Sequence, residues 1–135
     1  MTLTIANNYV LIIYQDGVWV TQLEDRRVAH TVALRGDACL LGVLAVNWGN
    51  EHEAGFLAST STGVVTDTSW KCSSQIANQW TELGFDDAAW SQALVRGTHG
   101  DARWESYHPQ ISAQAKWIWA HGTNATHVFC RKTLC

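Results

Sequence analysis

Apolar and polar residues alternate along most of the chain in short runs that end at turn residues, which is typical of β-strands. Runs of this kind, rich in β-branched and aromatic residues, cover 2–14, 18–20, 28–34, 39–47, 56–60, 64–65, 116–119 and 128–133. Only residues 88–90, with Asp86 or Asp87 as the N-cap, predict a helix, and that helix has one or two turns. Many short strands with so little helix predict an all-β fold, a single jelly-roll β-sandwich domain over residues 1–135.

Two segments give more specific expectations than the rest. Asp16-Gly17 lies between Tyr14 and Val18, and an Asp-Gly pair between two β-forming runs predicts a tight hairpin turn. Residues 39–47 are almost wholly apolar, which favours a central strand buried on both faces. Residues 97–112, by contrast, mix glycine, histidine and aromatic side chains and are predicted to form a long loop.

Composition excludes several classes of protein. A chain of 135 residues has room for one core, and 47% hydrophobic against 16% charged residues excludes a disordered chain. The net charge of −3 offers no basic surface to a nucleic-acid backbone. The longest apolar run, residues 39–46, is far shorter than the roughly 20 residues that a membrane span needs. We therefore expect neither a nucleic-acid partner nor a membrane span.

Tryptophan is the unusual component. Eight tryptophans are more than a small core needs, and tryptophan is a favoured residue for stacking on sugars, bases or partner proteins. Four of them have apolar neighbours and are predicted to be core residues: Trp70, Trp90, Trp117 and Trp119. Trp19 follows the predicted hairpin turn, and the sequence leaves it open whether this side chain is buried or exposed.

The cysteines indicate the compartment. The chain has four cysteines, Cys39, Cys72, Cys130 and Cys135. They lack the C-x-x-C spacing of a zinc site, which favours two disulfides in one of three possible pairings. Disulfides and the glycosylation sequon Asn124-Ala-Thr126 favour a secreted, extracellular protein. The first residues show no signal peptide, so the alternatives are a mature secreted form and an intracellular protein.

Seven segments, taken in order along the chain, carry a resemblance to a known family. They are Ala6–Gly17, Gly36–Asn47, Gly55–Ala58, Thr66–Lys71, Phe85–Trp90, Trp117–Trp119 and Phe129–Leu134. Together they resemble the galactose-binding-like jelly-roll domains, in particular the sugar-binding modules of bacterial α-L-rhamnosidases and small lectins of the same fold. This resemblance implies a lectin-type domain that binds a galactose- or rhamnose-type glycan or glycoprotein.

The resemblance also implies a calcium site. In the rhamnosidase modules an Asp-Asn pair and a later Asn surround a calcium ion that touches the sugar, and these positions correspond to Asn7, Asn8 and Asn47 here. Asn7 stands where the family has Asp, which removes a charge, and calcium usually takes at least one carboxylate. Two alternatives follow. Either Glu51 or Glu53 restores the charge and calcium binds, or the metal is lost and the carboxamides bind sugar hydroxyls directly.

Sugar recognition needs an aromatic face for the ring and planar amides or carboxylates for the hydroxyls. The predicted ligand-binding site therefore contains the three carboxamides and the loop that follows the central strand: Asn7, Asn8, Asn47, Trp48, Asn50, Glu51 and Glu53. In the competing interpretation these asparagines only fit turn geometry and Trp48 is partly buried. A second predicted surface comprises His99, Arg103 and Trp104, in a segment that continues to Tyr107 and His108. Its alternative is a solvated loop anchored by Trp104.

An enzyme is not expected. Asp86 and Asp87 are adjacent, which suits a helix cap rather than an acid and a base on opposite sides of a bond. The chain also lacks a G-x-S-x-G nucleophile motif. Because single sugar sites bind weakly, a homo-oligomer is the expected form of a useful lectin. The alternative function is a structural or protein-interaction domain that keeps the fold without a sugar site, which the Asn7 departure favours.

Overall fold

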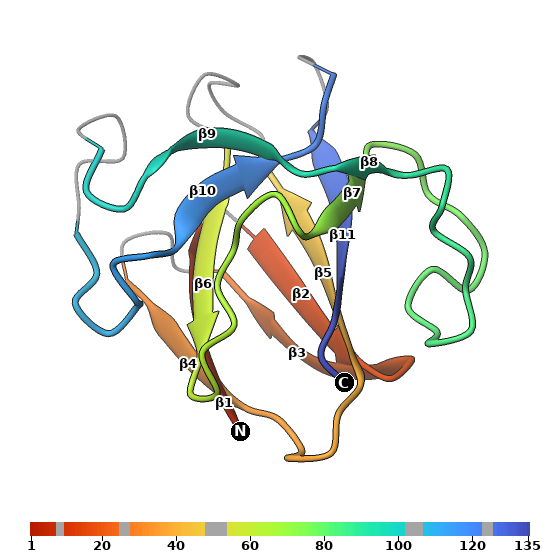
Figure 1. Ribbon diagram of the computed structural model, residues 1–135, viewed down its shortest axis with the longest axis horizontal. Coiled ribbons are helices and arrows are strands. Elements are labelled where there is room, and N and C mark those ends of the chain that lie inside the picture. The colour runs from red at the N-terminus through yellow and green to blue at the C-terminus, as the bar shows by residue number, and fades with distance from the viewer. Residues whose placement is uncertain (8–9, 25–27, 48–53, 102–106, 123–125) are drawn as a thin grey trace.

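The computed structural model describes residues 1–7, 10–24, 28–47, 54–101, 107–122 and 126–135 (Figure 1). Two antiparallel sheets pack face to face as a β-sandwich. The five-stranded sheet has the order β4 (His30–Ala33), β1 (Thr2–Asn7), β6 (Phe56–Thr60), β10 (Lys116–Trp119), β9 (Leu94–Thr98). The six-stranded sheet has the order β3 (Val18–Leu23), β2 (Val10–Gln15), β5 (Leu40–Val46), β11 (His127–Thr133), β7 (Lys71–Ser73), β8 (Ser91–Gln92).

The predicted β-sandwich is confirmed, and the described part of the chain contains no helix. Nor does that part contain a segment with the length and hydropathy of a helical membrane span. The single run predicted over 2–14 is in fact two strands, because β1 lies in the five-stranded sheet and β2 in the six-stranded one. The chain crosses between the sheets within the short connection from Asn7 to Val10.

The helix predicted at 88–90 is wrong. Asp86 accepts a hydrogen bond from the backbone N of Ala88 (3.0 Å), and the N of Trp90 donates to the carbonyl of Asp87 (2.9 Å), which makes a turn. The strand predicted at 64–65 is reduced to a single bridge between Ser59 and Val65. Strands β7, β8 and β9 were not predicted, and β9 occupies the start of the predicted 97–112 loop.

The predicted hairpin is confirmed, and its turn also fixes a distant segment. Asp16 and Gly17 both have positive φ, 48° and 84°, as a two-residue hairpin turn requires. The Asp16 carboxylate accepts hydrogen bonds from the backbone N of Cys39 (2.9 Å) and Leu40 (2.8 Å) and forms an ion pair with Arg35. Desolvation raises the pKa of Asp16, but these hydrogen bonds and the Arg35 charge outweigh it and hold the pKa below its usual value.

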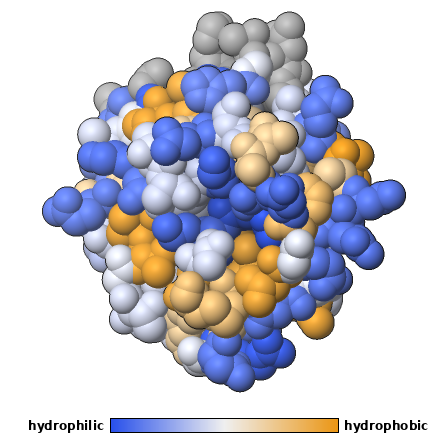
Figure 2. Space-filling view, turned by 45° about the vertical axis from the view of Figure 1, so that its right-hand side comes forward, coloured by the Kyte–Doolittle hydropathy of each residue, from blue (hydrophilic) through white to orange (hydrophobic). Residues whose placement is uncertain are grey.

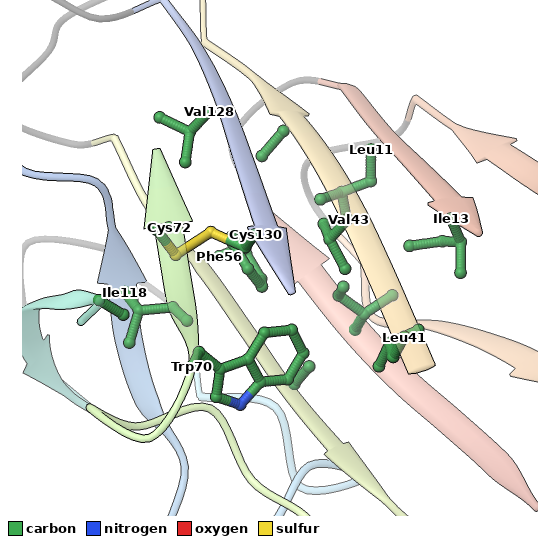
Figure 3. Close-up of a cluster of buried hydrophobic side chains, with 14 of the residues drawn as sticks. Leu11, Ile13, Leu41, Val43, Phe56, Trp70, Cys72, Ile118, Val128 and Cys130 are labelled. Carbon is green, nitrogen blue, oxygen red and sulfur yellow. A yellow bond between two sulfur atoms is a disulfide. The ribbon is translucent and has the colours of Figure 1, made fainter. Parts of the chain in front are cut away.

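The core lies between the two sheets. Inward-facing side chains of β2 and β5, such as Ile13 and Val43, meet those of β6 and β10 there (Figure 3). Trp70 is fully buried and packs edge-to-face on Phe56, with ring centroids 5.8 Å apart. The Cys72–Cys130 disulfide lies in the same core and joins β7 to β11 (Figure 3). The predictions that Trp70 and Trp119 are core residues are confirmed.

The outer face of the six-stranded sheet is also apolar, and the segment between β7 and β8 covers it. Trp80 packs edge-to-face on Tyr14 of β2 (5.5 Å) and Phe129 of β11 (5.3 Å). A Cβ at Gly42 would lie 3.3 Å from the Trp80 ring, so the indole needs a glycine beneath it. Trp90 stacks on Trp80 and is half-buried in this outer cluster rather than in the central core. Figure 2 turns the right-hand side of Figure 1 forward and shows mixed polar and apolar residues on the surface there.

Arg131 anchors that covering segment. Its side chain projects from the outer face of β11, is only 3% exposed and pairs with Asp87. It also donates to the carbonyl oxygens of Glu82 (2.8 Å) and Phe85 (3.3 Å). The Glu82 carbonyl also accepts from the backbone N of Phe85 (3.1 Å), so the guanidinium adds a second hydrogen bond there and supplies a donor to the Phe85 carbonyl.

The outer face of the five-stranded sheet is covered by residues 108–117. Ile111, Ala115 and Trp117 form a second buried cluster with Ala6 of β1 and Leu57 of β6. Successive side chains of a strand point to opposite faces, so Trp117 lies in this outer cluster and Ile118 in the central core. Trp117 is therefore buried, as predicted, but on the outside of the sheet.

The disulfides settle which of the three pairings is present: Cys39–Cys135 and Cys72–Cys130. Both chain ends lie at one end of the sandwich (Figure 1), where they flank residues 34–39. Leu34 donates from its backbone N to the carbonyl of Met1 (2.8 Å), and Leu134 donates in the same way to Cys39 (2.7 Å).

The two disulfides should differ in their reduction. Cys72 and Cys130 are buried, whereas Cys135 is exposed and Cys39 half-buried. Because thiol–disulfide exchange needs access to sulfur, dithiothreitol in native buffer should open Cys39–Cys135 first and leave Cys72–Cys130 intact until the protein unfolds. Alkylation with two isotopic labels, followed by peptide mass spectrometry, measures this order. Equal labelling of all four thiols in folded protein would contradict it.

Removing the Arg131 side chain should destabilise the fold strongly. Arg131→Ala removes the donor that serves the Phe85 carbonyl and the Asp87 carboxylate, while the Glu82 carbonyl keeps its bond from the backbone N of Phe85. We expect a loss of about 3 kcal/mol in the free energy of unfolding, near the lower end for a broken buried pair, because Asp87 keeps contact with solvent. The half-buried neighbour Lys132, changed to alanine, is the matched control, with an expected loss of under about 1 kcal/mol. Urea unfolding measures both, and equal losses would refute the anchoring role.

Candidate functional site

The ends of five strands meet at one end of the sandwich, which we call the β1/β5 end. There β1 finishes at Asn7, whose backbone pairs with Phe56 at the start of β6. On the facing sheet β5 finishes at Val46, which pairs with both Val10 of β2 and His127 of β11. The two segments that carry Asn7 and Asn47 therefore come to the same end of the molecule, one from each sheet (Figure 1).

Asn47 is the carboxamide whose side-chain environment the structure describes. It is 4% exposed, and its backbone N donates to the carbonyl of Thr126 (2.8 Å), which extends the β5–β11 ladder by one step. A side chain this buried does not reach out from an open rim. It suits either a support for the neighbouring loop or a contact to a ligand that is itself enclosed.

Most of the predicted site lies outside the described residues. This holds for the side chain of Asn7 and for Asn8, Trp48, Asn50, Glu51, Glu53, Arg103 and Trp104. For these residues the structure places the strand ends on either side but not the groups themselves.

The implied calcium ion can be tested against the donor chemistry. Asn7, Asn8 and Asn47 are neutral carboxamides, and three of them supply none of the negative charge that calcium sites usually contain. Within the ranges that the structure describes, no group of three or more His, Cys, Asp or Glu side chains is arranged to hold a metal. The carboxamides alone do not fit calcium, so a calcium site here requires Glu51 or Glu53.

The second predicted surface is built around His99, which follows β9. Its Nε2 lies 3.0 Å from the backbone N of His108, and its Nδ1 lies 3.0 Å from the carbonyl oxygen of Ser112. A backbone N–H can only donate and a carbonyl can only accept, so these contacts fix a neutral imidazole with its proton on Nδ1. Ser112 in turn donates from its backbone N to the Ser59 hydroxyl (2.9 Å), which ties this loop to β6.

Both ring nitrogens of His99 thus form hydrogen bonds to the backbone, and only the face of the ring is left for another contact. That face stacks on Tyr107, with ring centroids 4.1 Å apart and an interplanar angle of 14°. Tyr107 is 55% exposed, whereas its neighbour His108 is buried near Trp117, with ring centroids 6.4 Å apart. The sequence placed both residues on one loop but gave no signal for which of them faces solvent.

Burial lowers the pKa of His108, because it disfavours the charged imidazolium. The imidazole therefore stays neutral in the folded protein at a pH where it is protonated in the unfolded chain. Trp117, beside it, belongs to the outer cluster that includes Ala6, the residue before Asn7. The segment that holds His99 is accordingly anchored on the outer face of the five-stranded sheet, where Ser112 reaches Ser59, the partner of Thr4, and not at the β1/β5 end.

Comparison with known proteins finds no family model, no curated protein and no solved structure that matches this chain. The resemblance to galactose-binding-like domains therefore remains a prediction from the sequence.

Acid should destabilise the fold through His108. Its folded-state pKa lies below the unfolded value of about 6.5, so the unfolded state takes up the proton first as the pH falls. Stability is then complete above about pH 6.5 and declines below it, by up to about 1.4 kcal/mol per pH unit, until the folded-state pKa is reached. Urea unfolding at several pH values between 5 and 7 gives the free energy of unfolding as a function of pH. This free energy should change less steeply with pH in His108→Gln than in wild type, while His121→Gln, at an exposed histidine, should keep the wild-type pH dependence. Identical slopes in all three proteins would refute this assignment.

Proposed function

We propose that this protein is a carbohydrate-binding, lectin-type domain that recognises a galactose- or rhamnose-type glycan at the β1/β5 end. The observation that carries the proposal is the strand register, which brings the Asn7 and Asn47 segments from two different sheets to one end. The loop with Trp48 and Asn50 starts from the same end, directly after Asn47. A planar amide set with an adjacent indole is the chemistry that sugar hydroxyls and a pyranose face require.

Calcium enters this proposal in one of its two forms. If Glu51 or Glu53 joins the carboxamides, a calcium ion would hold the site together and touch the sugar. If neither does, the amides bind hydroxyls directly, and binding does not depend on a metal. In both forms the domain is a binding module without catalysis, presented by a secreted protein, and two disulfides are compatible with that location.

A glycan array tests the proposal directly. Wild-type protein should bind a subset of galactose- or rhamnose-terminated glycans, and Asn8→Ala should reduce the signal about tenfold, which corresponds to the loss of one or two hydrogen bonds to hydroxyls. Asn78→Ala, an exposed asparagine between β7 and β8, is the matched control and should bind like wild type. A run with chelator separates the two forms, since only the calcium form loses binding.

An array on which the folded wild-type protein binds no glycan, with and without added calcium, removes the lectin proposal. If Asn8→Ala and Asn78→Ala lose the same amount of glycan binding, the protein is still a lectin but the proposed location of its site is refuted. Thermal unfolding of each variant guards against a loss of binding that merely reflects unfolding.

A second function, a protein-interaction domain without a sugar site, is favoured by one edge of the six-stranded sheet. Val18 and Trp19 are each 58% exposed on β3, which has a partner strand on one side only among the described strands. An exposed indole beside unpaired backbone groups is typical of a surface that accepts another chain. Crosslinking to a partner protein that Trp19→Lys abolishes and Asn8→Ala leaves intact would support this function over the lectin.

A further inference from the structure

Two exposed polar residues, Thr126 and His127, are joined directly to the β1/β5 end. His127 pairs with Val46 of β5, and the carbonyl of Thr126 accepts a hydrogen bond from the backbone N of Asn47 (2.8 Å). Val46 and Asn47 are buried, with 5% and 4% of their surfaces exposed, whereas Thr126 and His127 are both exposed. Thr126 is therefore a solvent-accessible neighbour of the buried carboxamide, directly across the ladder.

Thr126 lies on the inner face of the six-stranded sheet. Side chains alternate between the two faces along a strand, and the hydrogen bond to Asn47 continues the ladder as far as Thr126. Ala45 and Val128 are both buried in the central core, so Asn47 and Thr126, each two positions away, share that inner face. It looks toward the other sheet, whose strand β1 finishes at Asn7 at the same end (Figure 1). The Thr126 side chain therefore lies at the open end of the sandwich, between the core and the solvent.

The hydroxyl group of Thr126 is held by the imidazole of the next residue. Its Oγ1 lies 3.0 Å from His127 Nδ1, and the tautomer of the imidazole decides which of the two atoms is the donor. A threonine hydroxyl has one proton and two lone pairs, so in both arrangements two of its three hydrogen-bonding positions are left for another partner. A sugar hydroxyl both donates and accepts, and it therefore fits either arrangement.

We propose that the Thr126 hydroxyl binds a hydroxyl group of the terminal sugar and that His127 is the positioning residue that fixes its direction. The inference rests on the proposed lectin function and adds to the β1/β5 end a contact residue whose side chain the structure describes. Because the imidazole already orients the hydroxyl, the group loses little rotational freedom when a sugar binds, and more of the hydrogen-bond energy contributes to affinity. In the alternative, the pair only stabilises the start of β11.

The test measures sugar affinity in variants that separate the two roles. Methyl galactoside and methyl rhamnoside are titrated by calorimetry into wild type, Thr126→Val, Thr126→Ser, His127→Phe and His127→Asn. Thr126→Val replaces the hydroxyl by a methyl group and should weaken binding of the recognised glycoside about tenfold, whereas Thr126→Ser should stay within about twofold of wild type. His127→Phe removes the partner of the hydroxyl and should weaken binding about threefold. His127→Asn should restore it, because the carboxamide puts a polar atom near the position of Nδ1.

Thr62→Val is the matched control and should bind like wild type. Thr62 is an exposed threonine whose hydroxyl also has a side-chain partner, Thr60 at 3.0 Å, and it follows β6 at the end of the sandwich opposite to Asn7. All proteins are made in a bacterial periplasm, where disulfides form. A host without N-glycosylation is needed, because Thr126→Val also removes the Asn124-Ala-Thr126 sequon.

The outcomes distinguish this inference from the lectin function on which it rests. If Thr126→Val loses thermal stability but binds like wild type, while Asn8→Ala loses affinity, the Thr126 contact is refuted and the lectin function stands. If His127→Asn binds as weakly as His127→Phe, the positioning role of His127 is refuted. If the folded wild-type protein binds neither glycoside and no glycan on the array, the contact and the lectin function are both refuted.

Discussion

Each sheet of this sandwich is apolar on its inner face and over part of its outer face, and the rest of the molecule is arranged to cover these apolar parts. On β5, Leu41 and Val43 face the central core while Gly42 faces outward beneath Trp80. On β6, Phe56 faces inward and Leu57 belongs to the outer cluster. A small two-layer domain leaves its outer faces to water, whereas here each sheet needs a third layer. Two long connections, between β7 and β8 and between β9 and β10, provide it.

A covering layer without regular structure has many backbone polar groups to satisfy, and the two connections solve this differently. Between β7 and β8 a single buried cation, Arg131, projects from the sheet and collects carbonyls from the turn, with Asp87 to balance its charge. Between β9 and β10 the neutral ring of His99 accepts from one backbone group and donates to another. In both cases one side chain with several donors or acceptors replaces the ladder that a strand would have formed.

The β-sandwich could be predicted from the sequence because strands with one or two buried faces leave a recognisable pattern of apolar residues. The apolar run of β5 and the Asp16-Gly17 turn were sufficient for this. It did not reveal that residues 2–14 change sheets, because both strands share one continuous pattern. The covering layers were missed for a related reason: Trp80 and His108 lie in connections that follow no periodicity, and alternation along residues 116–119 does not show that the outer face, where Trp117 lies, is covered. At the site, convergence of Asn7 and Asn47 was predicted by family resemblance, and no residue pattern by itself required it.

Connections cover a large part of both outer faces, and the two proposed functions use the strand ends and the sheet edges that they leave open. At the β1/β5 end both sheets contribute a segment. At the β3 edge one strand offers Val18 and Trp19 with its backbone. The first geometry suits a ligand held by several short polar contacts and a ring face, as a glycan is. The second suits an extended chain held by a ladder. The two surfaces belong to different elements, so substitutions at Asn8 and Trp19 test the two functions separately.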